Sequence, residues 1–203
     1  MKAVTVPAFL KIFYPSLLWS MPSGNNRLYL TFDDGPHPEI TPRVLKLLAD
    51  YQAEATFFCV GENAAKYPDV YQMILNQGHL TGNHTFNHLN GWRTPLNEYY
   101  ENVNLCRDVI DSTWFRPPYG RITPSQIQAL KKEYTIVMWS VLSYDFDRET
   151  TPDQCLDYVV NNAEDGSIIV FHDSEKSEDK MFYALRRVLE HYTNLGFSFK
   201  SLA

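Results

Sequence analysis

The sequence predicts an α/β fold, with a parallel sheet closed or nearly closed into a barrel. Strand-like and helix-like segments alternate along the chain with little between them, which is typical of repeated βα units. A chain of 203 residues is most simply one domain with a substantial core, and no linker, repeat or low-complexity tract divides it. We therefore expect a single domain over residues 1–203, with residues 1–26 as an N-terminal extension that packs on it.

Each expected element rests on its apolar spacing and on the residues that end it. The strands are short β-prone runs that end at glycine, proline or polar residues. They cover residues 28–32, 55–60, 79–81, 114–116, 134–139, 167–171 and 197–199. The helices have apolar residues at helical spacing, and the first of them has a threonine N-cap followed by proline. They cover residues 41–51, 63–77, 96–110, 124–133, 152–162 and 180–195.

The composition is that of an ordinary globular protein, with 44% apolar and 21% charged residues. A formal charge of −6 argues against nucleic acid as the main partner, because nucleic acids favour a basic face. The three cysteines, Cys59, Cys106 and Cys155, form no CxxC pair, so neither a thiolate zinc site nor a disulfide framework is indicated. A single disulfide with one thiol left over stays open. We expect a monomer.

The first 23 residues contain apolar pieces that are interrupted by Lys11 and three prolines. They form no continuous signal-peptide core with a cleavage site and no membrane-spanning length, so we expect no transmembrane segment. These signals alone predict a cytoplasmic protein, with a periplasmic or envelope-associated location as the alternative. A non-cleaved export segment or interfacial anchor is the less favoured interpretation.

Polar residues follow five separate expected strands, and the carboxyl ends of barrel strands meet on one face. This convergence predicts an active site there. The clusters are Asp33-Asp34, Asn83-His84, Arg116, Asp145 and His172.

Asp33 and Asp34 are adjacent carboxylates at the end of the first expected strand. Two like charges this close raise each other's pKa unless a cation or a hydrogen-bond donor separates them. A metal on one and a base role for the other would resolve the conflict. Taken alone, the pair would be an Asx-type turn that closes a strand.

His84 and His88 are four residues apart, a spacing that stacks two imidazoles on one face of a helical turn. Alone, such a pair is most simply two surface histidines. With a carboxylate such as Asp34, it supplies two nitrogens and one oxygen and leaves positions open, as catalytic zinc sites do. Imidazole ligands favour zinc, cobalt or nickel over magnesium.

The run Phe115–Gly120 is a proline-rich loop directly after an expected strand. We expect the amides of Tyr119 and Gly120 to be free, which would allow an N–H to bind a developing oxyanion. Arg116 is placed to pair with Asp33 and keep it ionised as a base. The alternative is a structural turn with a solvated arginine.

His172 ends a strand of the buried type, and across the cleft it could protonate a leaving amine. A carboxylate on its other ring nitrogen would set its pKa, and spacing does not decide between Asp145 and Asp147 for this role. The simpler interpretation is a polar residue at the rim.

The motifs TFDDGP, HTFNH and RPPYG, a tryptophan-containing strand followed by Asp145, and a strand ending in Val-Phe-His occur in that order. Together they resemble the five motifs of the polysaccharide deacetylases, carbohydrate esterase family 4, which share the NodB homology domain. The resemblance covers Leu28 to about Phe199. It implies a distorted (β/α) barrel of about seven strands.

The resemblance also implies an enzyme that hydrolyses carbon–nitrogen bonds other than peptide bonds, by metal-dependent removal of N-acetyl groups from an amino sugar. Asp34, His84 and His88 would bind the metal, most simply zinc, with cobalt or nickel as alternatives. Metal-bound water, deprotonated by Asp33, would attack the acetamide.

By the same resemblance, Arg116 would orient the base and the Tyr119 amide would help to form the oxyanion hole. His172 would be the general acid, tuned by Asp145. Tyr119 and Trp92 are our choices for sugar contact because both lie in expected loops at the site face. Trp139 lies inside an expected strand, which favours a core position.

The chain departs from the family pattern at three positions. The usual Asp-x-x-Asp-Trp of the fourth motif has Leu142 in place of the first Asp and Phe146 in place of the Trp, and the usual Leu-x-His of the fifth has Val170. Phe146 and Val170 remain apolar near the expected acyl pocket, so these departures bear on which acyl group fits. No expected metal ligand or proton-transfer residue is lost.

The expected substrate is an amino-sugar polymer or oligosaccharide, like peptidoglycan or a chitooligosaccharide. Two alternatives stay open. One is hydrolysis of another non-peptide C–N bond, in a cyclic or nonsugar amide, by the same site. The other is a catalytically silent carbohydrate-binding barrel.

Overall fold

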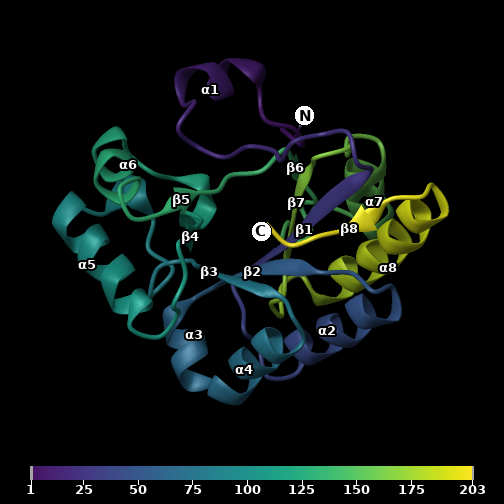
Figure 1. Ribbon diagram of the computed structural model, residues 1–203, viewed down its shortest axis with the longest axis horizontal. Coiled ribbons are helices and arrows are strands. Elements are labelled where there is room, and N and C mark those ends of the chain that lie inside the picture. Colours follow the sequence, from purple (N-terminus) through teal and green to yellow (C-terminus); the bar gives the residue numbers. More distant parts are fainter. Residues whose placement is uncertain (1, 203) are drawn as a thin grey trace.

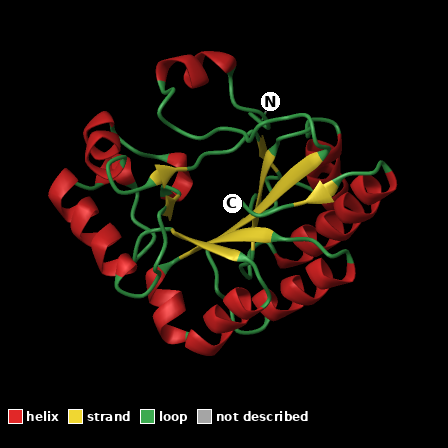
Figure 2. Ribbon diagram, in the orientation of Figure 1, coloured by secondary structure: helices red, strands yellow, loops and turns green. Residues whose placement is uncertain are grey.

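The chain folds into one parallel sheet with helices on its outer face, which confirms the predicted α/β class. The computed structural model describes residues 2–202, and Figures 1 and 2 show the strands as an inner arc surrounded by helices. Within that range the strands are β1 (Arg27–Asp33), β2 (Ala55–Cys59), β3 (Leu80–Asn83), β4 (Trp114–Phe115), β5 (Thr135–Ile136), β6 (Val141–Leu142), β7 (Ile168–His172) and β8 (Ser198–Phe199).

Seven of these strands form a curled sheet in the order β5-β4-β3-β2-β1-β7-β6, and β8 pairs with β1. Every pairing is parallel. The expected barrel type with about seven strands is therefore confirmed, with β8 as a short addition beside β1.

The helices lie between the strands in sequence, as the alternating pattern predicts. The described α-helices are α1 (Ala8–Phe13), α2 (Ile40–Asp50), α3 (Gly61–Lys66), α4 (Pro68–Asn76), α5 (Leu96–Arg107), α6 (Pro124–Leu130), α7 (Pro152–Val160) and α8 (Glu178–Asn194). One helix expected over residues 63–77 is therefore two, α3 and α4. The break is at Tyr67 (φ −124°, ψ 59°), because proline at position 68 disfavours helical geometry in the residue before it.

The expected strand over residues 134–139 is two short strands joined by a bend. β5 pairs with β4, whereas β6 pairs with β7, so residues 135–142 connect the two edge strands of the sheet. Trp139 lies in the bend, outside both strands.

The N-terminal segment packs across this connection. Thr5 forms an antiparallel bridge with Val141, and Leu18 forms a parallel bridge with Val137. Figure 1 shows α1 apart from the other helices, near the N-terminus. Its Ile12 side chain is 76% exposed. Among residues 2–202, no helix combines the length and the apolar character needed to cross a bilayer.

The two faces of β1 show how the fold positions the polar residues of the site. Leu30 and Phe32 belong to the main apolar cluster, which includes residues of α2 and α8. Thr31 and Asp33 alternate with them and meet the buried Arg116 side chain instead. One face of the strand therefore packs under helices, while the other carries polar groups into the concave side of the sheet. The three cysteines are free and buried.

Candidate active site

Asp33 and Asp34 diverge at the carboxyl end of β1. Asp33 is the last strand residue and pairs in register with His172 of β7. Asp34 has a φ of 81°, so the chain leaves the strand there and its carboxylate takes another direction. The Asn63 side-chain amide donates to the Asp34 carbonyl at 2.8 Å and so helps to hold this turn. Because of this geometry, Asp33 pairs with Arg116 while Asp34 faces His84 and His88.

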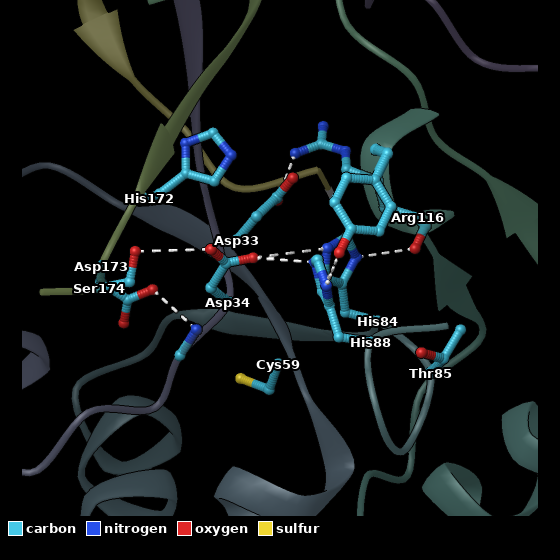
Figure 3. A network of polar contacts seen from close by, with 12 residues as sticks. Asp33, Asp34, Cys59, His84, Thr85, His88, Arg116, His172, Asp173 and Ser174 are labelled. Atoms are coloured by element: carbon cyan, nitrogen blue, oxygen red, sulfur yellow. Dashed lines mark hydrogen bonds and ion pairs between the residues drawn. The ribbon is translucent and has the colours of Figure 1, made fainter. Parts of the chain in front are cut away.

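Asp34, His84 and His88 come together as a candidate metal centre (Figure 3). The Asp34 Oδ1 atom lies 3.1 Å from His88 Nε2 and 3.9 Å from His84 Nε2, and one ligand atom from each residue lies within 4.8 Å of the others. Two imidazole nitrogens and one carboxylate oxygen suit zinc, cobalt or nickel. The residues present therefore fit the divalent metal that the motifs imply.

The protonation states favour metal binding at this cluster. Burial lowers the pKa of His84 to about 4, and its Nδ1 lies 2.8 Å from the Arg116 carbonyl, which can only accept a hydrogen bond. Nδ1 therefore carries the proton, and the lone pair of Nε2 faces Asp34. Burial opposes the ionisation of Asp34, but the His88 hydrogen bond and the charges of His172 and Lys176 hold its pKa well below the usual value.

The expectation that His84 and His88 stack on a helical turn is wrong. Residues 84–88 form a loop in which Thr85 (φ 61°) and His88 (φ 56°) have left-handed backbones. Side-chain hydrogen bonds replace the helical ones: Asn83 Oδ1 accepts from the Thr85 N–H, and Thr85 Oγ1 accepts from the Leu89 N–H. Asparagine and threonine favour such local bonds over a helical backbone.

Arg116 is fully buried beneath the site, so the solvated-arginine alternative is wrong. Its NH1 group donates to Asp33 Oδ1 at 2.8 Å and to Thr31 Oγ1 at 2.7 Å, and NH2 donates to the Met138 carbonyl at 2.8 Å. The guanidinium also lies 4.2 Å from the centre of the Phe58 ring. Burial lowers the pKa of this guanidinium, while the charge of Asp33 opposes that effect. The expected pairing of Arg116 with Asp33 is present.

Only one of the two amides expected to be free is free. The Gly120 N–H donates to the Pro117 carbonyl at 3.0 Å, which closes a tight turn. The Tyr119 N–H has no acceptor among residues 2–202. The Tyr119 side chain is 60% exposed and places its hydroxyl 3.2 Å from His88 Nδ1.

The structure decides which carboxylate meets His172. Asp145 accepts from His172 Nδ1 at 2.7 Å and from the His172 backbone N–H at 2.7 Å, whereas Asp147 pairs with Lys2 at 3.1 Å. Burial opposes the imidazolium, but the charge of Asp145 and its hydrogen bond outweigh burial and raise the pKa of His172 to about 9. The Phe146 ring packs edge-on against the imidazole, with centroids 4.9 Å apart. His172 is therefore held protonated at neutral pH.

A cavity of about 190 Å³ brings the predicted groups to one place. Its walls include Asp33, Asp34, His84, His88, Tyr119, Phe146, Val170 and His172. Trp92 does not line this cavity; it lines a neighbouring one. Trp139, expected in the core, packs partly against the core but also lines the site, because it lies in the bend after β5.

Two further residues near the site were missed by sequence reasoning. Lys176 places its Nζ 2.8 Å from Asp34 Oδ2, and no motif marked that loop. Asp173 follows His172 directly, and its buried carboxylate accepts from the Gly35 N–H and the Thr41 hydroxyl. Burial raises the pKa of Asp173 to about 7. Its position directly after a candidate catalytic histidine was the available signal.

Known proteins resemble this chain over most of its length. One Bacillus cereus peptidoglycan-N-acetylglucosamine deacetylase is 33% identical over 193 residues, which cover 91% of this chain and 90% of the relative. A second B. cereus protein of the same name is 35% identical over 161 residues, which cover 76% of this chain but only 58% of the relative. This chain thus spans less than two thirds of that longer relative.

A solved structure extends the similarity to the fold. The Bc1960 peptidoglycan N-acetylglucosamine deacetylase has a TM-score of 0.89 and 30% identity, with 97% of this chain and 95% of that chain covered. A family model described as polysaccharide deacetylase matches residues 20–137, more than half of the sequence. The order of the five motifs, the shared fold and this match agree: the chain belongs to the polysaccharide deacetylase family.

Proposed function

We propose that this chain is a metal-dependent hydrolase that removes N-acetyl groups from an amino-sugar glycan of the peptidoglycan type. The observation that carries the proposal is that one cavity is lined by the Asp34–His84–His88 cluster, by Asp33 and by His172. Buried partners behind the lining hold two of these groups: Arg116 pairs with Asp33, and Asp145 pairs with His172. The lining groups supply a metal site, a base and an acid. The names of the relatives support this substrate class.

A divalent metal at Asp34, His84 and His88 would supply Lewis-acid polarisation and lower the pKa of water. That metal requirement is supported by the ligand of the similar Bc1960 structure, 4-naphthalen-1-yl-N-oxidanyl-benzamide. This compound is a hydroxamic acid, a chemical class that chelates divalent metals. The carboxylate of Asp34 and the imidazoles of His84 and His88 are suitable ligands for such a metal.

The residues of this chain would handle the protons and the developing charge. Asp33, which is held in place by the hydrogen bond from Arg116, accepts a proton from the attacking water. The Tyr119 N–H, which has no acceptor within residues 2–202, donates to the acyl oxygen as charge develops there. His172 gives its proton to the amide nitrogen as the C–N bond breaks. The products are acetate and a free amino sugar.

Acetate release provides the direct test. We expect release from peptidoglycan fragments or chitooligosaccharides, its loss after chelation, and its recovery on addition of zinc, cobalt or nickel. Simple acetamides and cyclic amides serve as comparison substrates. Turnover of those alone would favour another C–N hydrolase, and sugar binding without turnover by metal-loaded protein would favour the silent barrel.

The pH dependence tests the acid. Because the pKa of His172 is raised to about 9, the imidazole is protonated below that pH and loses its proton above it. We therefore expect kcat/KM to fall on the alkaline side near pH 9. Asp145→Asn removes the carboxylate that raises this pKa, so the alkaline limb should move to lower pH. A limb that stays in place would show that this pair does not control the step; Asp147→Asn is the matched control.

A further inference from the structure

A second cavity of about 600 Å³ lies directly beside the candidate active site. Its volume is within the range of small-molecule binding sites. The N-terminal segment forms one wall with Val6, Leu10 and Tyr14, and Ile127 of α6 contributes to another. The proposed deacetylation chemistry uses neither this space nor these residues.

The cavity adjoins the site through shared walls. Five residues line both spaces: Tyr119, Gly120, Trp139, Leu142 and Phe146. Two of them, Leu142 and Phe146, flank the site on the side of β6, where Leu142 is in register with Val170 of β7. The larger cavity is therefore reached from the apolar side of the site. The metal cluster and Lys176 line only the smaller cavity.

The chain departs from the family pattern at this boundary. Leu142 replaces the aspartate of the fourth motif, Phe146 replaces its tryptophan, and Tyr144 between them also lines the larger cavity. Aspartate at position 142 would place a carboxylate on the shared wall, and that charge would oppose an apolar occupant. Leucine leaves the wall without charge.

The chemistry of the lining restricts the occupant. Among the described residues, no side chain that lines the larger cavity carries a charge, and most are aliphatic or aromatic. Trp92 and Tyr119, our choices for sugar contact, are exposed at the edge of this lining, so a sugar ring would lie there. Between the buried lining residues Leu17, Trp19 and Met138, a pyranose ring would leave several hydroxyl groups without partners, at a cost in free energy for each. An alkyl chain has no such groups, and its burial is favourable. The sugar is thereby directed to the exposed edge of the cavity and the alkyl chain to its buried part.

Building on the proposed function, we propose that the cavity receives the alkyl chain of an N-acyl group longer than acetyl. The substrate class is then an amino sugar that carries an apolar N-acyl chain such as butanoyl or hexanoyl. In the reaction, the water oxygen joins the acyl carbon and the C–N bond breaks. The amine takes a proton, which leaves a free amino sugar and an alkyl carboxylate.

An acyl-length series tests this proposal. N-acetyl, N-butanoyl and N-hexanoyl chitobiose are compared by kcat/KM, with the released carboxylate as the readout. Each buried methylene is expected to raise kcat/KM about fourfold, and hexanoyl has four methylenes more than acetyl. With only two of the four buried, the hexanoyl substrate should still exceed the acetyl one by at least about tenfold. A preference for acetyl would overturn the proposal.

Two substitutions on α1 provide a matched comparison. Leu10→Trp adds bulk at the cavity wall, whereas Ile12→Trp makes the same kind of change at an exposed position outside the lining. We expect Leu10→Trp to lower the hexanoyl-to-acetyl ratio at least about tenfold, the loss of roughly two buried methylenes. Ile12→Trp should leave the ratio within about twofold, as a surface change does. Equal ratios in both variants would overturn the proposal.

A third variant and a binding measurement keep the test independent of catalysis. Leu142→Asp restores the carboxylate of the family pattern and should also lower the ratio, even if Leu10→Trp fails to fold. Calorimetric titration compares N-hexanoyl with N-acetyl chitobiose. Tighter hexanoyl binding supports the cavity assignment even if neither compound is hydrolysed, an outcome that would refute only the proposed function. Equal binding overturns the cavity assignment, even if acetate is released.

Discussion

Asp33→Asn is expected to lower kcat for deacetylation by about 10²–10⁴-fold, the usual contribution of a general base. Asparagine keeps the size of the side chain, and its amide oxygen can still accept the hydrogen bond from Arg116. It cannot take a proton from water. The candidate metal ligands are unchanged, so metal content measured by elemental analysis should match that of the wild type.

Asp147→Asn is the matched control for this experiment, because Asp147 pairs with Lys2 and does not line the site cavity. Its kcat should stay within about twofold of wild type, as expected for a surface change. If Asp33→Asn kept near-wild-type turnover with normal metal content, another group would have to be the base. Asp34 would then be the first to examine, because it is the neighbouring carboxylate.

Arg116→Met is expected to lower the free energy of unfolding by about 3–5 kcal/mol, as breaking a buried ion pair does. Arg116 is fully buried, and the Asp33 side chain is almost so. Without the guanidinium, Asp33 stays buried without its charge partner, and Thr31 and the Met138 carbonyl lose a donor. Denaturant unfolding measures the change.

Two further variants separate the ion pair from the loss of an arginine as such. Arg148→Met removes an exposed arginine and should change the free energy of unfolding by less than about 0.5 kcal/mol. The double variant Asp33→Asn with Arg116→Met should regain part of the lost stability, because the unpaired charge is gone, but no activity. If Arg116→Met and wild type had equal free energies of unfolding, the ion pair would contribute less to stability than its burial implies.

Local patterns explain why the chemistry could be predicted from the sequence. Asp33-Asp34 and His172 come at the ends of apolar, β-prone runs that predict strands of a parallel sheet, and parallel strands bring their carboxyl ends to one edge. The proline pair after Arg116 restricts the loop that follows it. The grouping of these residues therefore needed the fold class but no coordinates.

Other features depend on contacts between distant segments. The loop from His84 to His88 is held by Asn83 and by Asn102 of α5. The four-residue spacing of the two histidines suggested a helical turn, which does not form. Trp139 reaches the site because the strand it was assigned to bends between two pairings. Neither the contact with Asn102 nor the two separate strand pairings can be predicted from the local sequence.

The sequence by itself determined the fold class, the family and the residue types of the site, because periodicity and motif order are properties of the chain. Only the tertiary structure decided that Asp145 rather than Asp147 holds His172, and that Arg116 is buried against Asp33. It also decided that the N-terminal segment forms a wall of an apolar cavity beside the site. The physical reason is that burial, pairing and cavity shape arise from residues brought together across the sheet, more than 80 positions apart for Arg116 and Asp33.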